Sequence, residues 1–252
     1  MKKIANIFPI ANQKFYKNET YIMILAHLLK DGLYDAKYFN KDSQYVILDN
    51  GLFENSQVSN DLETYIQLAE TCGIKVNEIV IPDAMFNYKE TIQLFEKNLE
   101  TIKKWQYKYK FMFVAQAQNY EEFKNIIEYI NKQNYNLSIG IPKKCIIARD
   151  SAAAIELYKK CVHPIHLLGV KSSFAEILPA YKYIRGCDTS QLAFIAKNVD
   201  SDNLKDVDVV NYVRDGIDID LRNDKVNNYD LEKLLNMEKE GFNYYGILWC
   251  YC

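Results

Sequence analysis

Three aspartates of the chain, Asp49, Asp83 and Asp188, each directly follow a short apolar run. A carboxylate in such a place is costly unless it is solvated, paired or used in a reaction. Each aspartate taken alone could simply cap a following helix, since aspartate is a favoured first residue there. Three in the same context are poorly explained by capping. They predict a cluster of carboxylates that can act as nucleophile, acid and base.

Polar and small residues lie at corresponding places on the intervening segments. Gln116 follows the apolar run that ends at Ala115, and Gly140 lies near the end of the next one. Paired carboxylates suit chemistry at a glycosidic bond, where one attacks the sugar and the other moves a proton around an oxocarbenium-like transition state. This chemistry requires that the strand ends meet in space.

The elements that would position these residues alternate between β-rich runs and amphipathic helical patterns. Helices are expected over Tyr21–Lys30, Asp61–Thr71 (ended by Gly73), Tyr88–Lys104, Glu121–Lys132, Ser151–Cys161 and Phe174–Ile184. Strands are expected over Ile4–Ile10, Tyr45–Leu48, Glu78–Ile81, Phe111–Ala115, Leu137–Ile141 and Ile165–Val170, with a seventh element around Cys187 and a poorly defined eighth near Tyr244–Trp249.

This alternation predicts an α/β fold with a parallel sheet and right-handed crossovers. An open doubly wound sheet usually has a glycine-rich phosphate loop after its first strand, whereas Ile10–Gln13 contains no glycine. We therefore expect one domain over 1–252, a (β/α)8 TIM-type barrel with an irregular part after Ala196. In such barrels the catalytic residues lie at the C-terminal ends of the strands.

Several strand-end segments together resemble the tRNA-guanine transglycosylases. Asp49-Asn50-Gly51-Leu52-Phe53 is similar to the D-S-G-G-F/Y segment of that family, and Ile81-Pro82-Asp83 to its next acidic strand end. The remaining matches, in chain order, are Val114-Ala115-Gln116-Ala117 with V-Q-G-G, Ser138-Ile139-Gly140-Ile141 with A-I-G-G-L, Leu167-Leu168-Gly169-Val170 with Y-L-M-G-V, and Gly186-Cys187-Asp188-Thr189-Ser190 at the place of F-D-C. The segments run in the family's order over about Ile47–Ser190.

The chain also departs from that family. Leu52 replaces the second glycine of the first motif, and Val114–Gln118 lacks the paired glycines. The family's cysteine-rich zinc subdomain has no counterpart, and the chain is far shorter. These departures point to the compact relatives that act on DNA, the 7-deazaguanine DNA transglycosylases of phages and bacterial modification islands. Related DNA-base glycosylases of phage defence are a second possibility.

The resemblance implies a role for each strand-end residue in a pentosyl-transfer reaction. Asp188 would attack C1′ of a guanosine and hold a covalent glycosyl intermediate, while Asp49 would protonate the leaving base and deprotonate the incoming one. Asp83 would accept hydrogen bonds from N1–H and the exocyclic amine of guanine or of a free 7-deazapurine. Gln116 and the backbone of Gly140 would complete the base pocket on the carbonyl edge.

Other residues are candidates for stacking and for phosphate contacts. Phe53, or Met85 with Phe86, could stack on a flipped base, although ordinary core or rim packing is the simpler explanation of such residues. His163 and His166 flank Pro164 at the entry to a strand, the wrong end for catalysis, so we expect structural roles for both. Phosphate contacts are expected from Lys143, Lys144, Arg149, Lys171 and Arg185.

Composition and charge limit the class of protein. With 31 basic and 33 acidic residues the net charge is −2, which counts against a dedicated non-specific nucleic-acid binder but allows a local basic rim. The acidic run Asp200–Asp224 is expected to be a solvated loop, because its spacing lacks the pattern of a calcium loop.

No apolar segment approaches the ~20 residues that span a bilayer, so no membrane partner is expected. The six scattered cysteines and the absence of a recognisable signal peptide predict a cytoplasmic protein with free thiols. Cys250 and Cys252 are the only close pair, and no zinc or cofactor is expected.

Three alternatives to base exchange stay open at this point. The same carboxylates with water as the acceptor would give a hydrolytic DNA glycosylase that leaves abasic sites. The near-neutral charge also fits an unrelated barrel enzyme of small-molecule metabolism. A barrel retained only as an interaction module is the third alternative.

Overall fold

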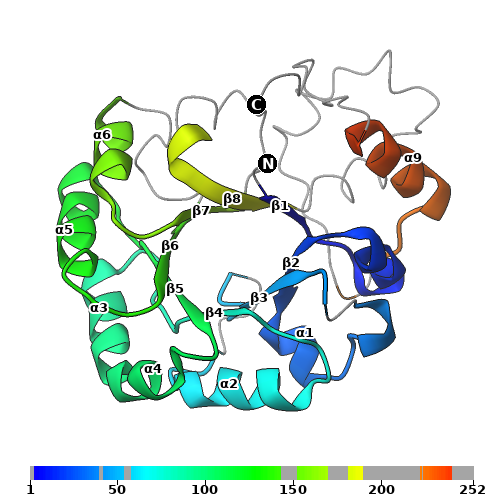
Figure 1. Ribbon diagram of the computed structural model, residues 1–252, viewed down its shortest axis with the longest axis horizontal. Coiled ribbons are helices and arrows are strands. Elements are labelled where there is room, and N and C mark those ends of the chain that lie inside the picture. Colours follow the sequence, from blue (N-terminus) through cyan, green and yellow to red (C-terminus); the bar gives the residue numbers. More distant parts are fainter. Residues whose placement is uncertain are drawn as a thin grey trace.

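A computed structural model shows a closed barrel of parallel strands in which β1 to β8 follow one another around the ring and β8 pairs with β1 (Figure 1). It describes residues 3–39, 42–53, 58–142, 152–169, 181–189, 222 and 224–239. The strands are β1 (Lys3–Asn6), β2 (Tyr21–Leu25), β3 (Tyr45–Asp49), β4 (Glu78–Val80), β5 (Lys110–Val114), β6 (Leu137–Pro142), β7 (Ile165–Leu168) and β8 (Ile184–Thr189). The expected (β/α)8 TIM-type barrel is confirmed.

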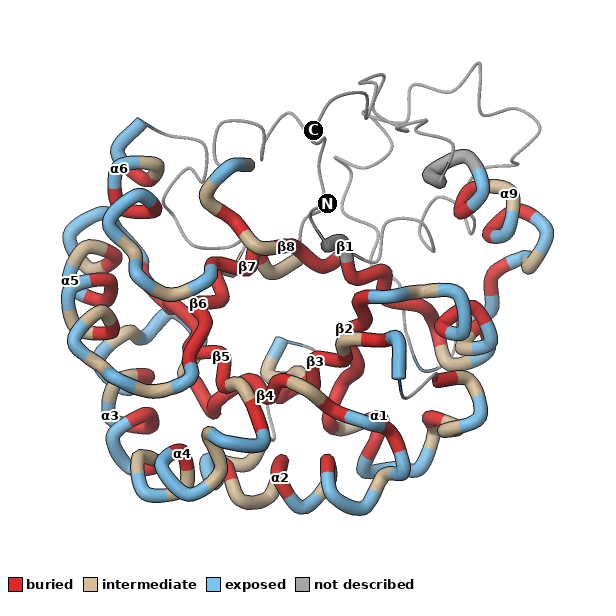
Figure 2. The backbone as a smooth tube through the Cα atoms, in the orientation of Figure 1, coloured by how far each residue is buried: buried red, intermediate tan, exposed pale blue. Residues whose placement is uncertain are grey.

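Helices form an outer layer around the strands. They are α1 (Ala26–Lys30), α2 (Leu62–Thr71), α3 (Tyr88–Lys97), α4 (Leu99–Trp105), α5 (Tyr120–Ile130), α6 (Ala152–Lys160) and α9 (Asn228–Lys239), with 3₁₀ helices η1 (Ile10–Asn18), η2 (Ala36–Tyr38) and η4 (Tyr181–Tyr183). Figure 2 shows that most strand residues are buried, whereas the helices alternate between buried and exposed positions. This is the burial expected of a sheet covered on its outer face by amphipathic helices.

The segment Tyr21–Lys30, expected to be one helix, is a strand followed by a short helix. All five residues of β2 are buried, and each pairs in register with β3, from Tyr21 opposite Tyr45 to Leu25 opposite Asp49. A continuous apolar run carries no periodicity that separates a buried strand from a buried helix. With β2 in place the described ring is complete, and the eighth strand expected near Tyr244–Trp249 lies outside the described residues.

Other boundaries also differ from expectation. The first strand ends at Asn6 instead of Ile10, and Tyr88–Lys104 is two helices, α3 and α4, that meet at Asn98. The buried Asn98 side chain donates to the Leu94 carbonyl and accepts from the backbone N–H of Leu62 at the start of α2, at 2.9 Å. Asn98 thus links the junction of α3 and α4 to the start of α2. Of the expected helix Phe174–Ile184, 174–180 lie outside the described residues, and Ile184 begins β8.

The C-terminal helix α9 was not expected from the sequence. The buried side chain of Asn12, in η1, donates to the Val226 carbonyl at 3.0 Å and accepts from the Val226 backbone N–H at 3.0 Å. Leu231, Leu234 and Leu235 of α9 are buried in the same core as the barrel. The acidic run Asp200–Asp224 lies outside the described residues apart from Arg222 and Asp224.

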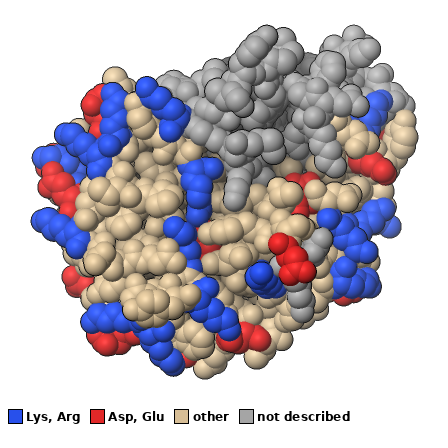
Figure 3. Space-filling view, in the orientation of Figure 1, with Lys and Arg blue, Asp and Glu red and all other residues tan. Residues whose placement is uncertain are grey.

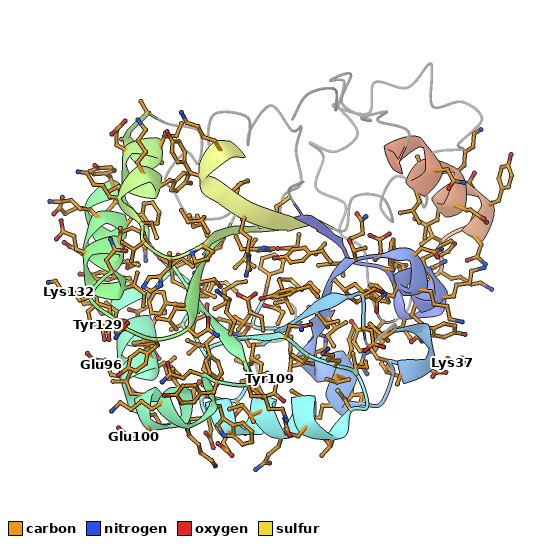
Figure 4. All side chains as sticks on the ribbon, in the orientation of Figure 1. Lys37, Glu96, Glu100, Tyr109, Tyr129 and Lys132 are labelled. Carbon is orange, nitrogen blue, oxygen red and sulfur yellow. The ribbon has the colours of Figure 1, made fainter. Side chains whose placement is uncertain are left out.

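Surface charges of both signs are interspersed on the face drawn in Figure 3, in keeping with the near-neutral net charge. Polar contacts also join neighbouring helices on the outside of the barrel. In Figure 4, Tyr129 of α5 and Glu96 of α3 lie together, and the Tyr129 hydroxyl donates to the Glu96 carboxylate at 3.1 Å. None of the described helices is long and apolar enough to cross a membrane.

A buried ion pair fills the N-terminal end of the barrel. Arg185 of β8 donates to both carboxylate oxygens of Glu78 of β4, at 2.7 and 3.2 Å. The hydroxyls of Tyr45 and Ser138 also donate to Glu78. Burial alone would raise the pKa of Glu78, but the Arg185 charge and these donors hold it below its usual range. Glu78 begins β4 and Arg185 is the second residue of β8, whereas Asp49 ends β3, so Arg185 lies at the end opposite to Asp49 and pairs with Glu78 instead of the expected phosphate.

Removing the Glu78 charge should destabilise the barrel strongly. Glu78→Gln leaves the partly buried Arg185 cation, whose side chain is 19% exposed, without its counter-charge, and loss of a buried charge partner costs up to about 3–5 kcal/mol. The matched control is Glu100→Gln, because Glu100 is 86% exposed and its pair with Lys103 at 2.6 Å, screened by water, should contribute little to stability. Urea unfolding of the two variants measures the difference. Equal and small losses would show that the buried pair is not needed.

Candidate functional site

The three predicted aspartates lie around one pocket at the C-terminal ends of the strands. Asp49 is the last residue of β3, Asp83 follows β4, and Asp188 is near the end of β8. The pocket has a volume of about 320 Å³. Its described lining is Ile7, Met23, Asp49, Asn50, Leu52, Phe53, Asp83, Met85, Phe86, Val114, Gln116, Pro142, Leu168, Gly169 and Asp188. Two carboxylates at opposite ends of the barrel would have excluded a shared site, and the structure brings all three together.

Asp83 is buried and held by two side-chain amides. Asn50 donates to one carboxylate oxygen and Gln116 to the other. Backbone groups fix both amides, because Asn50 accepts from the Leu52 N–H at 2.9 Å and Gln116 accepts from the Phe86 N–H at 3.1 Å. Each amide must therefore turn its NH2 group toward the carboxylate. Asp83 is thereby oriented as a hydrogen-bond acceptor in the pocket wall.

The pKa of Asp83 is raised by its burial. Desolvation lifts the pKa of this carboxyl from 3.8 to about 6, against the opposing effect of the hydrogen bonds from Gln116 and Asn50. Neutral amides stabilise the anion less than a cation would, so burial dominates. Asp83 is therefore ionised at neutral pH and becomes neutral in mildly acidic solution.

Asp49 is held by a tight turn at the end of β3. Its carboxylate accepts from the Gly51 backbone N–H at 3.0 Å, a turn in which an aspartate side chain bonds the backbone two residues on. Gly51 has a φ of 76°, in the left-handed region that favours glycine. A Cβ on Gly51 would lie 2.6 Å from Nδ1 of His27. The glycine thus permits both the turn and the close approach of His27.

Asp188 has partners on both carboxylate oxygens. The His166 ring nitrogen Nε2 lies 3.1 Å from Oδ1, and the Gly169 backbone N–H donates to Oδ2 at 2.9 Å. Asp188 is almost fully buried, but it forms part of the pocket wall. These bonds orient the carboxylate and lessen the cost of its burial.

His166 was expected to be structural and remote from the site, but it contacts Asp188. It is the second residue of β7, is fully buried and pairs in register with Gly186, two residues before Asp188. Because side chains alternate along a strand, His166 shares a face with Leu168, which lines the pocket. That alternation is the sequence signal that could have identified it. His163, by contrast, contacts the Ile130 carbonyl at 3.0 Å, on the strand-entry side.

Large apolar side chains form the outer wall of the pocket. Phe53, Met85 and Phe86 all line it, with 51%, 37% and 37% of their surface exposed. Phe86 has a φ of 58°, a conformation that residues other than glycine rarely adopt. Its backbone N–H bonds Gln116 in that conformation. The same local geometry therefore orients the amide that holds Asp83.

Gly140 is not part of the described lining of the pocket. The carbonyl of Gly140 accepts from the Ala115 N–H at 2.8 Å, and a Cβ there would lie 2.8 Å from Leu168 and Met112. The lack of a side chain at Gly140 thus leaves space for Leu168, which lines the pocket. Lys171 lies outside the described residues, as do Lys143, Lys144 and Arg149.

No group of three or more potential metal-binding side chains occurs among the residues that the structure describes. Cys250 and Cys252 lie outside those residues. A search with protein-family models finds no match to the chain, and a search of curated proteins finds none either.

Gly51→Ala should destabilise the protein more than the same change at Gly32. Both glycines have positive φ values, 76° and 69°, but a Cβ at Gly32 meets nothing within 4 Å. Gly32→Ala therefore measures the cost of the backbone conformation, about 1–2 kcal/mol, and Gly51→Ala adds the contact with His27. Urea unfolding should show the larger loss for Gly51→Ala. Equal losses would mean that His27 moves aside without cost.

Proposed function

We propose that this protein is a transglycosylase that exchanges guanine in nucleic acid, with DNA as the polymer, for a 7-deazaguanine base. The observation that carries the proposal is the shared pocket of Asp49, Asp83 and Asp188 at the C-terminal mouth of the barrel. It agrees with the order of the strand-end segments that resemble the transglycosylase family. The chemistry of each carboxylate supports one step of the reaction.

Asp83 suits the recognition of a guanine edge. Each carboxylate oxygen has about two acceptor positions, and the amides of Asn50 and Gln116 occupy one on each. The remaining positions can accept from two adjacent donors, which guanine and 7-deazaguanine present as N1–H and the exocyclic amine. Asp83 would therefore select bases with this pair of donors. Adenine lacks a donor at N1, so it could not make both of the hydrogen bonds that guanine offers to Asp83.

Asp188 and Asp49 would share the transfer of the sugar. The Asp188 carboxylate attacks C1′, the C1′–N9 bond breaks, and Asp49 donates a proton to the departing base. Asp49 then takes the N9 proton of the incoming base. That nitrogen attacks C1′ and the ester to Asp188 breaks, which restores both carboxyl groups. No oxidant, reductant or further reactant is needed.

The rest of the wall supports a flat, uncharged ligand. Besides three carboxylates, the described lining is mainly apolar and includes no lysine or arginine, which disfavours a phosphorylated or acidic metabolite within the pocket. Phe53, Met85 and Phe86 present exposed apolar surface on which an extruded base can stack. A nucleic acid would bring such a base into the pocket and keep its phosphates outside.

Asp188→Asn should abolish base exchange, because an amide cannot form the glycosyl ester. The measurement is the incorporation of radiolabelled guanine into duplex and single-stranded DNA, with tRNA as the alternative polymer. Wild-type protein trapped with substrate should carry an adduct on Asp188 by intact mass and digestion. Asp61→Asn is the matched control. Asp61 is an exposed helix cap that accepts a hydrogen bond from the Glu63 N–H, and the side-chain oxygen of an asparagine can accept the same bond.

The outcomes of this experiment separate the alternatives. Abasic sites without incorporation of guanine would show that the protein hydrolyses the glycosidic bond and does not exchange the base. An adduct on Asp49 would show that Asp49 is the nucleophile and Asp188 the acid and base. Full exchange by Asp188→Asn, or no reaction of the wild-type protein with any of the polymers, would overturn the proposal.

Guanine binding should weaken in mildly acidic solution. The pKa of Asp83 is about 6, so the ionised acceptor predominates above that pH and is lost as the pH falls through it. At pH 5 about a tenth of the protein would hold the ionised form, which reduces the apparent affinity about tenfold. Calorimetric titration with guanine at pH 5 and pH 7.5 measures the change. Asp83→Asn should bind weakly at both pH values, and a wild-type affinity that is constant or rises toward pH 5 would contradict the role.

A further inference from the structure

A buried chain of hydrogen bonds leads from Asp188 into the barrel. The His166 ring joins Asp188 through Nε2 at 3.1 Å and the Tyr21 hydroxyl through Nδ1 at 3.1 Å. Asp188 and His166 come from β8 and β7, whereas Tyr21 begins β2, so the chain crosses the interior of the barrel. His166 is fully buried and Tyr21 nearly so.

We infer that His166 is a positioning residue that uses a single neutral tautomer, with the proton on Nε2 donated to Asp188 and with Nδ1 accepting from the Tyr21 hydroxyl. The catalytic role of His166 rests on the proposed function. Its tautomer rests only on the contacts among Asp188, His166 and Tyr21. The inference gives a role to a histidine that lies behind the pocket wall and does not touch the ligand space.

The chemistry of the two neighbours sets the tautomer. An ionised carboxylate can only accept, so a bond between Nε2 and Asp188 requires a proton on Nε2. Burial raises the pKa of Tyr21 far above its usual range, and its hydroxyl keeps its proton and can donate to Nδ1. A histidine between a donor and a carboxylate thus has one arrangement that satisfies both ring nitrogens while remaining neutral.

The Tyr21 side chain is itself held in place from behind. Its ring stacks on Tyr45 with centroids 5.4 Å apart, and the Arg185 guanidinium lies 5.8 Å from the Tyr21 centroid. Tyr45 and Arg185 both donate to Glu78, which balances the guanidinium charge. The ion pair at the N-terminal end of the barrel therefore supports the tyrosine that orients His166.

The consequence for Asp188 is a fixed orientation with its charge retained. Among the residues that the structure describes, His166 and the Gly169 N–H each hold one position on a different oxygen, and a second lone pair of an oxygen would attack C1′. A neutral donor assists the departure of the carboxylate when the ester breaks, since the hydrogen bond strengthens as the negative charge returns. Loss of this donor should slow the chemical step and leave base binding unchanged.

The first test is independent of any activity. The chain has 3 histidines, so ¹⁵N-histidine NMR resolves each ring, with His166→Gln for assignment. At pH 7.5 we expect His166 to be neutral with its proton on Nε2, and Tyr21→Phe should shift the Nδ1 resonance, because Nδ1 loses its donor while Asp188 still holds the proton on Nε2. An imidazolium, a proton on Nδ1 alone, or a spectrum unchanged by Tyr21→Phe would overturn the inference even if the protein had no exchange activity.

The second test measures kcat and KM for guanine exchange. His166→Leu should lower kcat at least about tenfold with KM for DNA and Kd for guanine within about twofold, and His166→Gln should recover much of kcat through its side-chain N–H. His163→Gln is the matched control away from the pocket, and urea midpoints verify folding. If the wild-type protein exchanges bases, unchanged kcat in His166→Leu, or equal losses in His166→Leu and His166→Gln, would overturn the role.

Discussion

The pairing of β1 with β8 closes the ring, and the shared pocket of the three aspartates depends on that closure. Four residue pairs join the two strands, from Lys3 opposite Gly186 to Asn6 opposite Thr189. Because all strands are parallel, closure brings all of their C-terminal ends to one mouth. Residues as distant in sequence as Asp49 and Asp188 can then line one pocket. An open sheet of the same strands would place β1 and β8 at opposite edges.

Closure also creates an interior in which charges must be compensated, and the barrel does this differently at its two ends. At the N-terminal end Glu78 faces the Arg185 cation together with two hydroxyl groups. At the C-terminal mouth the described hydrogen-bond partners of Asp83 and Asp188 are amides, a backbone N–H and a histidine ring. A cation neutralises a carboxylate, whereas such donors orient it and leave charge available for a ligand.

The two ends are coupled through tyrosine side chains. Tyr45 bonds Glu78 and stacks on Tyr21, and Tyr21 bonds His166 behind Asp188. The interior of the barrel is thus partly a polar layer that connects a structural ion pair to a predicted catalytic carboxylate. Through Tyr45 and Tyr21 the ion pair is thus in contact with the histidine that orients Asp188. Precise orientation of reacting groups is a large part of what an active site supplies.

The amino-acid sequence by itself determined the fold class and the three strand-end aspartates. The alternation of apolar runs and helical patterns is a local property, and the position of Asp49, Asp83 and Asp188 directly after such runs is equally local. Parallel strands in a barrel then require these residues to share one mouth. Strand β2 was not predicted, because Tyr21–Leu25 is apolar and buried throughout and lacks the alternation of apolar and polar residues that would distinguish a strand from a helix.

Only the tertiary structure decided how those carboxylates are compensated. Arg185 and Glu78 are 107 residues apart, and Tyr21 and His166 are 145 apart. Nothing local to Arg185 distinguishes a buried partner of Glu78 from a surface contact to phosphate. Because β7 has only four residues, His166 near its start resembles a residue at the strand entry. The register with β8 and the face of the strand on which His166 lies place its side chain beside Asp188. Hydrogen-bond partners across a closed barrel depend on strand register and on which face each residue occupies, and these are fixed only when all eight strands are paired.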